Sequence, residues 1–125
     1  LEHSYKLKDN YDIRAPGVGV RIQSLSGGNQ QKVVVARELS EEPMLTIASQ
    51  PTRGVDIGNI EAIHKQIVDI RDQGNAVLLI SAELDEVMSV ADRVGVMYEG
   101  EFVTWVNPKD VDQSEMGLYM AGIKD

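Results

Sequence analysis

Apolar residues follow two different patterns in the middle of the chain. Between residues 56 and 74 they recur every three or four positions, which predicts an amphipathic helix. The repeating residues are Ile60, Ile63, Ile67 and Ile70. Residues 44–48 and 76–81 are short continuous apolar runs, typical of strands that are buried on both faces. With a further helix predicted over 83–91, this alternation predicts an α/β fold with a parallel sheet.

Residues that start and stop helices support this interpretation. Residues 27–39 predict another helix, because Ser26 can cap its first turn and Pro43 prevents it from continuing. Asp56 can cap the amphipathic helix in the same way, and Gly74 stands where helices commonly end.

The helix predicted over 83–91 has an apolar and an acidic side. We expect its apolar residues, Leu84, Val87 and Met88, to point inward. We expect the acidic residues, Glu83, Asp85 and Glu86, to form a solvated face near the positive end of the helix dipole.

The last part of the chain predicts a hairpin and a final helix. Residues 94–98 and 102–106 flank Glu99-Gly100, a tight-turn pair between two apolar runs. Phe102 and Trp105 alternate with polar residues, so we expect one face of the hairpin to pack inward. A helix is predicted after residue 108. Residues 1–24, by contrast, are polar and broken by Pro and Gly, which predicts an irregular segment.

Composition narrows the possible functions. The 125 residues carry a formal net charge of −8, which argues against nucleic acid as a partner, because such binding needs clustered Lys and Arg. The absence of cysteine leaves neither a disulfide framework nor a thiolate metal site. No apolar run approaches the roughly 20 residues that span a bilayer.

One octamer carries recognisable chemistry. Residues 25–32 combine a hydroxyl and two glycines with the start of a predicted helix. Unpaired N–H groups and the helix dipole favour an anion there, and the glycines let a phosphate approach the backbone closely. The candidate ATP-binding residues are Leu25, Ser26, Gly27, Gly28, Asn29 and Gln30. A glycine-rich loop with an ordinary serine cap would look the same.

This octamer resembles the signature motif of ATP-binding cassette (ABC) ATPases. Residues 51–56 resemble the turn that follows the family's second nucleotide motif, residues 78–87 its switch region, and residues 91–100 the segment after it. The resemblance runs from about residue 20 to residue 122. It implies the C-terminal part of a P-loop NTPase sandwich, an α/β fold with parallel strands, flanking helices and a β-hairpin. Residues 1–24 would then be an irregular lead-in from the upstream part of the cassette, and residues 25–125 the C-terminal portion of the nucleotide-binding domain.

Within the family, the chain is most similar to the second cassette of bacterial ATPases that serve importers of nucleosides and simple sugars. Residues 25–32, 50–54 and 115–122 carry this similarity. It implies an ATP-hydrolysing subunit on the cytoplasmic face of the membrane that uses ATP and Mg²⁺. The implied partners are the first cassette of the same polypeptide and membrane permease subunits.

The chain departs from the family pattern at positions that carry chemistry. It contains no phosphate-binding loop G-x-x-x-x-G-K-[ST]. Ser49 and Gln50 stand where the family has a magnesium-binding Asp and a catalytic Glu, and Ala82 replaces the switch His. A Gln amide cannot accept a proton, so a contribution of roughly 10²–10⁴-fold is lost. We expect a degenerate site of its own, a signature lent to the partner cassette, and no activity of the chain in isolation.

Other candidate residues have more than one interpretation. Asp56 resembles the family's aspartate at the interface between cassettes, and it can equally be a helix cap. His64 has no second ligand nearby, so we predict a structural role and no metal site. Two other classes stay open: a regulatory or binding module derived from a cassette, and the ATPase head of a DNA-maintenance protein. The acidic charge and the uncharged residues 49 and 50 weigh against the latter.

Overall fold

The computed structural model describes residues 1–123, which form two compact units that meet in sequence between Ile80 and Ser81. In the first unit, strands β1 and β2 pair in parallel, with Leu45 opposite Ala76 and Ser49 opposite Ile80. The elements of this unit are α1 (Glu2–Asn10), a short 3-10 helix η1 (Ile22–Ser24), α2 (Gly27–Leu39), β1 (Leu45–Ser49), α3 (Ile57–Asp72) and β2 (Ala76–Ile80). The predicted parallel strands and the two capped helices are confirmed, each within a residue or two of the expected bounds.

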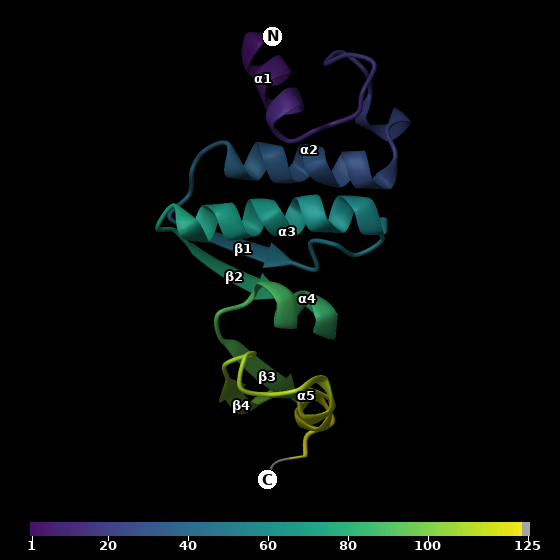
Figure 1. Ribbon diagram of the computed structural model, residues 1–125. Helices are drawn as coiled ribbons and strands as arrows, with labels where there is room; N and C mark the ends of the chain where they lie inside the picture. The colour runs from purple at the N-terminus through teal and green to yellow at the C-terminus, as the bar shows by residue number, and fades with distance from the viewer. Residues whose placement is uncertain (124–125) are drawn as a thin grey trace. The chain divides into compact units, whose positions relative to one another are not determined.

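Two helices cover one face of this sheet. Helix α3 packs against the sheet and α2 packs against α3 (Figure 1). The side chains buried between these layers are Ala36, Leu39, Ile63, Ile67 and Ile70. The three isoleucines lie three or four residues apart, as the sequence pattern predicted, so the helix presents them on one face.

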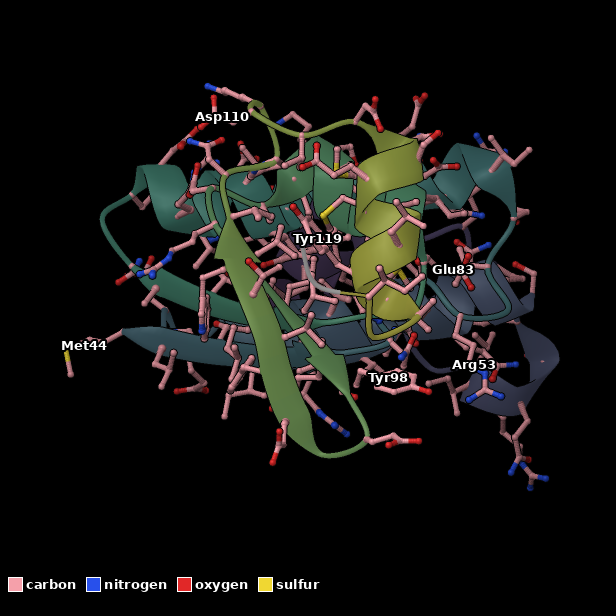
Figure 2. The ribbon with its side chains drawn as sticks, turned by 90° about the horizontal axis from the view of Figure 1, so that it is seen from below. Met44, Arg53, Glu83, Tyr98, Asp110 and Tyr119 are labelled. Atoms are coloured by element: carbon pink, nitrogen blue, oxygen red, sulfur yellow. The ribbon has the colours of Figure 1, made fainter. Side chains whose placement is uncertain are left out.

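The opposite face of the sheet is exposed in the described residues, so the prediction of strands buried on both faces is wrong. The exposed side chains are Leu45, Ile47, Leu78 and Ile80, at 47–63% exposure. Alternate residues of a strand point to opposite faces, and the helices cover one of the two. Met44, next to β1, also extends into solvent (Figure 2).

The prediction of an irregular segment is wrong for Glu2–Asn10, which form α1. None of the residues of α1 is buried, so an apolar period could not reveal it. Lys6 and Glu2 form an ion pair of 3.2 Å one turn apart, which favours the helix. The proline and glycines that suggested irregular structure lie beyond its end.

The second unit pairs a hairpin with two helices. Its elements are α4 (Leu84–Val90), β3 (Val94–Tyr98), β4 (Glu101–Val106) and α5 (Gln113–Met120). The strands are antiparallel. Glu99 and Gly100 connect them with φ of 46° and 84°, the left-handed pair that a tight hairpin turn requires. The predicted hairpin and both predicted helices are therefore confirmed.

The core of this unit lies between the hairpin and α4 and α5. It consists of Val94, Val96 and Met116, with Leu84, Val87 and Met88 packed against it. The inward orientation predicted for these three residues of α4 is thus confirmed. Glu86, however, is only 3% exposed, so the prediction of a fully solvated acidic face is wrong at that position.

The aromatic residues of the hairpin are also placed differently from the prediction. Phe102 and Trp105 are 51% and 52% exposed rather than packed inward. Their ring centroids lie 4.7 Å apart, and the Arg93 guanidinium lies 4.9 Å from the Trp105 ring. A β-bulge between Val96 and Met97 changes the register of the strands, so alternation along β4 did not predict its inward face. Among the described residues, no helix is both long and apolar enough to cross a membrane.

Candidate functional site

The first turn of α2 carries the octamer that the sequence singled out. Ser26 is the N-cap, with extended backbone (φ −61°, ψ 155°), and its hydroxyl accepts hydrogen bonds from the Asn29 backbone N–H at 3.4 Å and from Asn29 Nδ2 at 2.9 Å. Ser26 and Gly27 are exposed, whereas Gly28 and Asn29 are buried. The positive end of the helix and two accessible residues therefore face solvent, where an anionic group can reach them.

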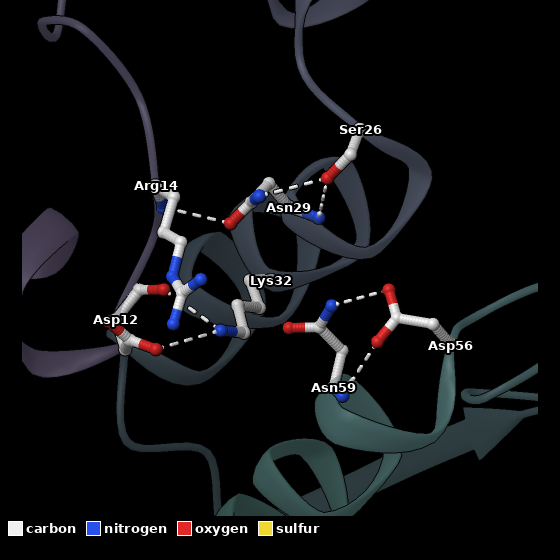
Figure 3. A network of polar contacts seen from close by, with 7 residues as sticks. All are labelled: Asp12, Arg14, Ser26, Asn29, Lys32, Asp56 and Asn59. Atoms are coloured by element: carbon white, nitrogen blue, oxygen red, sulfur yellow. Dashed lines mark hydrogen bonds and ion pairs between the residues drawn. The ribbon is translucent and has the colours of Figure 1, made fainter.

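Polar side chains of α2 fix this turn to two other segments, of which the one at Arg14 is drawn in Figure 3. Asn29 Oδ1 accepts a hydrogen bond from the backbone N–H of Arg14 at 2.8 Å. Gln30 Nε2 donates to the Leu25 carbonyl at 2.8 Å, and Gln31 Nε2 donates to the Pro51 carbonyl at 2.6 Å. The start of the helix is thus held from both sides before any ligand binds, which is the condition for preorganised binding.

Lys32 provides a further anchor. Its side chain is 6% exposed, and Nζ donates to the Asp12 carbonyl oxygen at 2.9 Å and lies 3.2 Å from Asp12 Oδ2. The hydrogen bond and charge of Lys32 hold the pKa of the Asp12 carboxyl below its ordinary value. Because the ammonium is satisfied by Asp12, Lys32 joins α2 to the segment that follows α1 and is not directed at a ligand.

Asp56 caps α3 in the structure. Its Oδ1 accepts from the Asn59 backbone N–H at 3.1 Å and its Oδ2 accepts from Asn59 Nδ2 at 2.8 Å. These hydrogen bonds from Asn59 hold the pKa of the Asp56 carboxyl below its ordinary value. The helix-cap interpretation of Asp56 is confirmed; a role between cassettes stays a prediction.

Two of the three positions that depart from the family pattern, Ser49 and Gln50, lie at the end of β1. Ser49 pairs with Ile80 at the last position of the sheet, and the Gln50 N–H donates to the Ile80 carbonyl at 2.7 Å. Gln50 then adopts a left-handed backbone (φ 49°), which turns the chain toward exposed Arg53. Neither residue is a carboxylate, so Mg²⁺, which prefers carboxylate oxygens, does not fit the pair.

The third position, Ala82, is exposed and follows β2 by two residues. Its methyl group offers neither a proton nor a hydrogen bond to a phosphate. The described residues contain no group of three or more His, Cys, Asp or Glu that could hold a metal ion.

Sequence reasoning included Gln31 and Lys32 in the octamer without a supporting role, and it missed Asp12 and Asn59. A signal for Lys32 was present, because it lies four residues after Gly28 and four before Ala36, on the face of α2 that is buried. A lysine on a buried helix face needs an anionic or carbonyl partner. The partner itself, Asp12, lies 20 residues away and could not be identified without the fold.

Solved structures of similar fold identify the architecture of the chain. One is a dimeric ATP-binding cassette in a post-hydrolysis state bound to ADP and Pi, with TM-score 0.74 and 21% identity over 86% of this chain and 46% of that chain. Another is a nucleotide-free ATP-binding cassette from an ABC transporter, with TM-score 0.72 and 24% identity over 99% of this chain and 50% of that chain. The fold is therefore that of part of an ATP-binding cassette, and the predicted fold class is confirmed.

No family model matches the chain. Individual proteins of similar sequence are nevertheless found, and they are more similar to it than the solved structures are. The nucleoside import ATP-binding protein NupA of Lactococcus lactis is 48% identical over 120 residues, which are 96% of this chain and 24% of the relative. The guanosine import ATP-binding protein NupO of Bacillus subtilis is 49% identical over 112 residues, 90% of this chain and 22% of the relative.

A third relative, the glucose import ATP-binding protein TsgD13 of Haloferax volcanii, is 44% identical over 122 residues, 96% of this chain and 22% of the relative. The chain spans about a quarter of the length of these relatives. It is a homologue of one segment of the ATP-binding proteins of nucleoside and sugar importers.

Proposed function

We propose that this chain is part of the ATP-hydrolysing subunit of an importer for nucleosides or simple sugars. In this proposal the first turn of α2 with its cap, residues 26–29, forms one side of an ATP site; we call it the signature turn. The phosphate loop, magnesium ligands and base of that site come from a partner cassette, the first cassette of the same polypeptide. The subunit would act on the cytoplasmic face of the membrane, against permease subunits. The names of the relatives support the substrate class.

The observation that carries the proposal is the exposed start of α2. Ser26 and Gly27 are accessible, while the rest of the turn is held by Asn29, Gln31 and Lys32. An ATP γ-phosphate fits this end of the helix, where N–H groups and a hydroxyl can donate to it without rearrangement. Charge that develops on the phosphoryl oxygens during transfer is stabilised by such fixed donors.

The other ATP site of the pair, to which this chain would contribute residues 49, 50 and 82, would be inactive. Ser49, Gln50 and Ala82 offer no carboxylate for magnesium, no base for the attacking water and no imidazole for the γ-phosphate. Of the two ATP sites in a head-to-tail pair of cassettes, only the one that receives Ser26 would then turn over at full rate.

Substitution of Ser26 in the full-length subunit tests the proposal. Ser26→Ala removes a donor to the γ-phosphate, so we expect ATP turnover to fall by about two orders of magnitude. Because Ser26 also caps α2, Ser26→Asp serves as a second variant: it retains a good cap and places a negative charge beside the phosphate. Loss of turnover in both variants supports the proposal.

Asp112→Ala is the matched control, because Asp112 caps α5 in the same way. Its Oδ1 accepts a hydrogen bond from the Glu115 N–H at 2.8 Å. We expect this variant to lose stability and to retain turnover. Unchanged turnover in Ser26→Ala and Ser26→Asp would refute a signature role for this turn.

A further inference from the structure

The two glycines of the signature turn have different surroundings. Gly27 is exposed, and a Cβ atom added there would meet only the Gly54 carbonyl oxygen, at an ordinary 3.8 Å. Gly28 is buried against the start of α3. A Cβ there would overlap Asn59 Nδ2 and would lie 2.9 Å from Asn59 Cγ and 3.2 Å from Asp56 Oδ2. The space beside Gly28 is therefore filled by the chain itself.

Asn59 cannot move aside without cost. Its Nδ2 donates to Asp56 Oδ2 at 2.8 Å, while its backbone N–H donates to Asp56 Oδ1 at 3.1 Å. Asp56 is in turn fixed as the N-cap of α3. A rotation of the Asn59 side chain would break its hydrogen bond to Asp56 Oδ2 and remove one of the two contacts by which Asn59 holds the N-cap of α3. Asn59 thus limits how far α2 can approach α3.

We infer that Asn59 is a positioning residue for the signature turn, and that residue 28 is glycine because the Asn59 amide occupies the place of its Cβ. This inference rests on the proposed function, since it concerns how that turn is aimed. The pair of Asp56 and Asn59 sets the position of the first turn of α2, and with it the Ser26 hydroxyl and the Gly27 N–H. Gly28 thus leaves room for the Asn59 amide at the start of α3, whereas no close atom stands where the Cβ of residue 27 would lie.

A double substitution in the full-length subunit separates this explanation from direct approach of phosphate to Gly28. Gly28→Ala pushes α2 away from α3, and we expect the kcat of ATP hydrolysis to fall roughly tenfold or more. Asn59→Ala removes both Asn59 atoms that collide with the new methyl group. The variant with both substitutions should therefore recover to the rate of Asn59→Ala alone. Asn59→Ala alone should lower kcat about two- to fivefold with little change in KM, because it loosens the aim of the turn and removes no ligand contact.

Hydrogen exchange of α2 in the same variants gives an independent readout. Gly28→Ala should accelerate exchange over residues 28–39, the double variant should restore protection, and Gly27→Ala should leave protection unchanged because its Cβ meets no close atom. Ser26→Ala is measured in parallel. Loss of turnover in Ser26→Ala with no rescue of Gly28→Ala by Asn59→Ala would overturn this inference and leave the proposed function intact. Full turnover in Gly28→Ala would also overturn the inference, whereas full turnover in Ser26→Ala would overturn the proposed function.

Discussion

Lys32 offers a quantitative test of how the signature turn is held. Its side chain is 6% exposed and ends on two oxygen atoms of Asp12. Lys32→Ala removes three buried methylene groups at about 0.8 kcal/mol each, and a net hydrogen-bond contribution of about 1 kcal/mol. About 1.5 kcal/mol of side-chain entropy is no longer lost on folding. The expected destabilisation is therefore about 2 kcal/mol.

Lys32→Met is the matched variant, because methionine retains an apolar stem of similar length and removes the ammonium. Burial of the stem then remains, and the ammonium no longer has to be desolvated, so we expect a loss within about 1 kcal/mol. Native-state hydrogen exchange of the α2 amides measures both opening free energies directly. Equal losses in Lys32→Ala and Lys32→Met would refute the assignment of most of the energy to the buried stem, and a loss below about 0.5 kcal/mol in Lys32→Ala would refute the anchor itself.

Two further predictions concern a carboxylate and a turn. The folded-state pKa of Asp56 lies below its ordinary value of 3.8, so its contribution to stability is complete above that value and is lost as the pH falls through the lower, folded pKa. In urea unfolding, the stability difference between the protein and Asp56→Asn should narrow below about pH 4; a difference independent of pH from 7 to 2 would contradict this. Glu99→Asn should stabilise the hairpin by up to about 1 kcal/mol, because residue 99 has a left-handed backbone (φ 46°) that asparagine tolerates better. Thermal unfolding followed by fluorescence of Trp105, the single tryptophan, reports on this unit, and an unchanged or lower Tm would refute the reasoning.

Local signals in the sequence predicted local structure well. Ser26 and Asp56 were expected to cap helices, and each accepts a hydrogen bond from the backbone N–H three residues later. Glu99-Gly100 was expected to turn the hairpin, and both residues have positive φ. Such features depend on a few neighbouring residues, so the chemistry of the sequence specifies them.

Features that depend on distant partners were not predictable in the same way. Helix α1 buries no residue, so its sequence lacked the apolar period that reveals helices. The exposed face of β1 and β2 resembles a buried one in sequence, since the pattern records apolar character and not what covers it. The contacts that support the candidate site could not be predicted for the same reason. Lys32 and Asn59 meet Asp12 and Gly28 only after α2 has packed against its neighbours.

Titration of the chain with Mg-ATP, followed residue by residue by NMR, tests most directly whether it provides only the signature half of a nucleotide site. The proposed function predicts weak binding, in the millimolar range typical of a few unsupported phosphate contacts, with shifts confined to Ser26, Gly27, Gly28 and Asn29. Tight binding, or shifts centred on Ser49 and Gln50, would contradict it, because the chain would then contain a nucleotide pocket of its own.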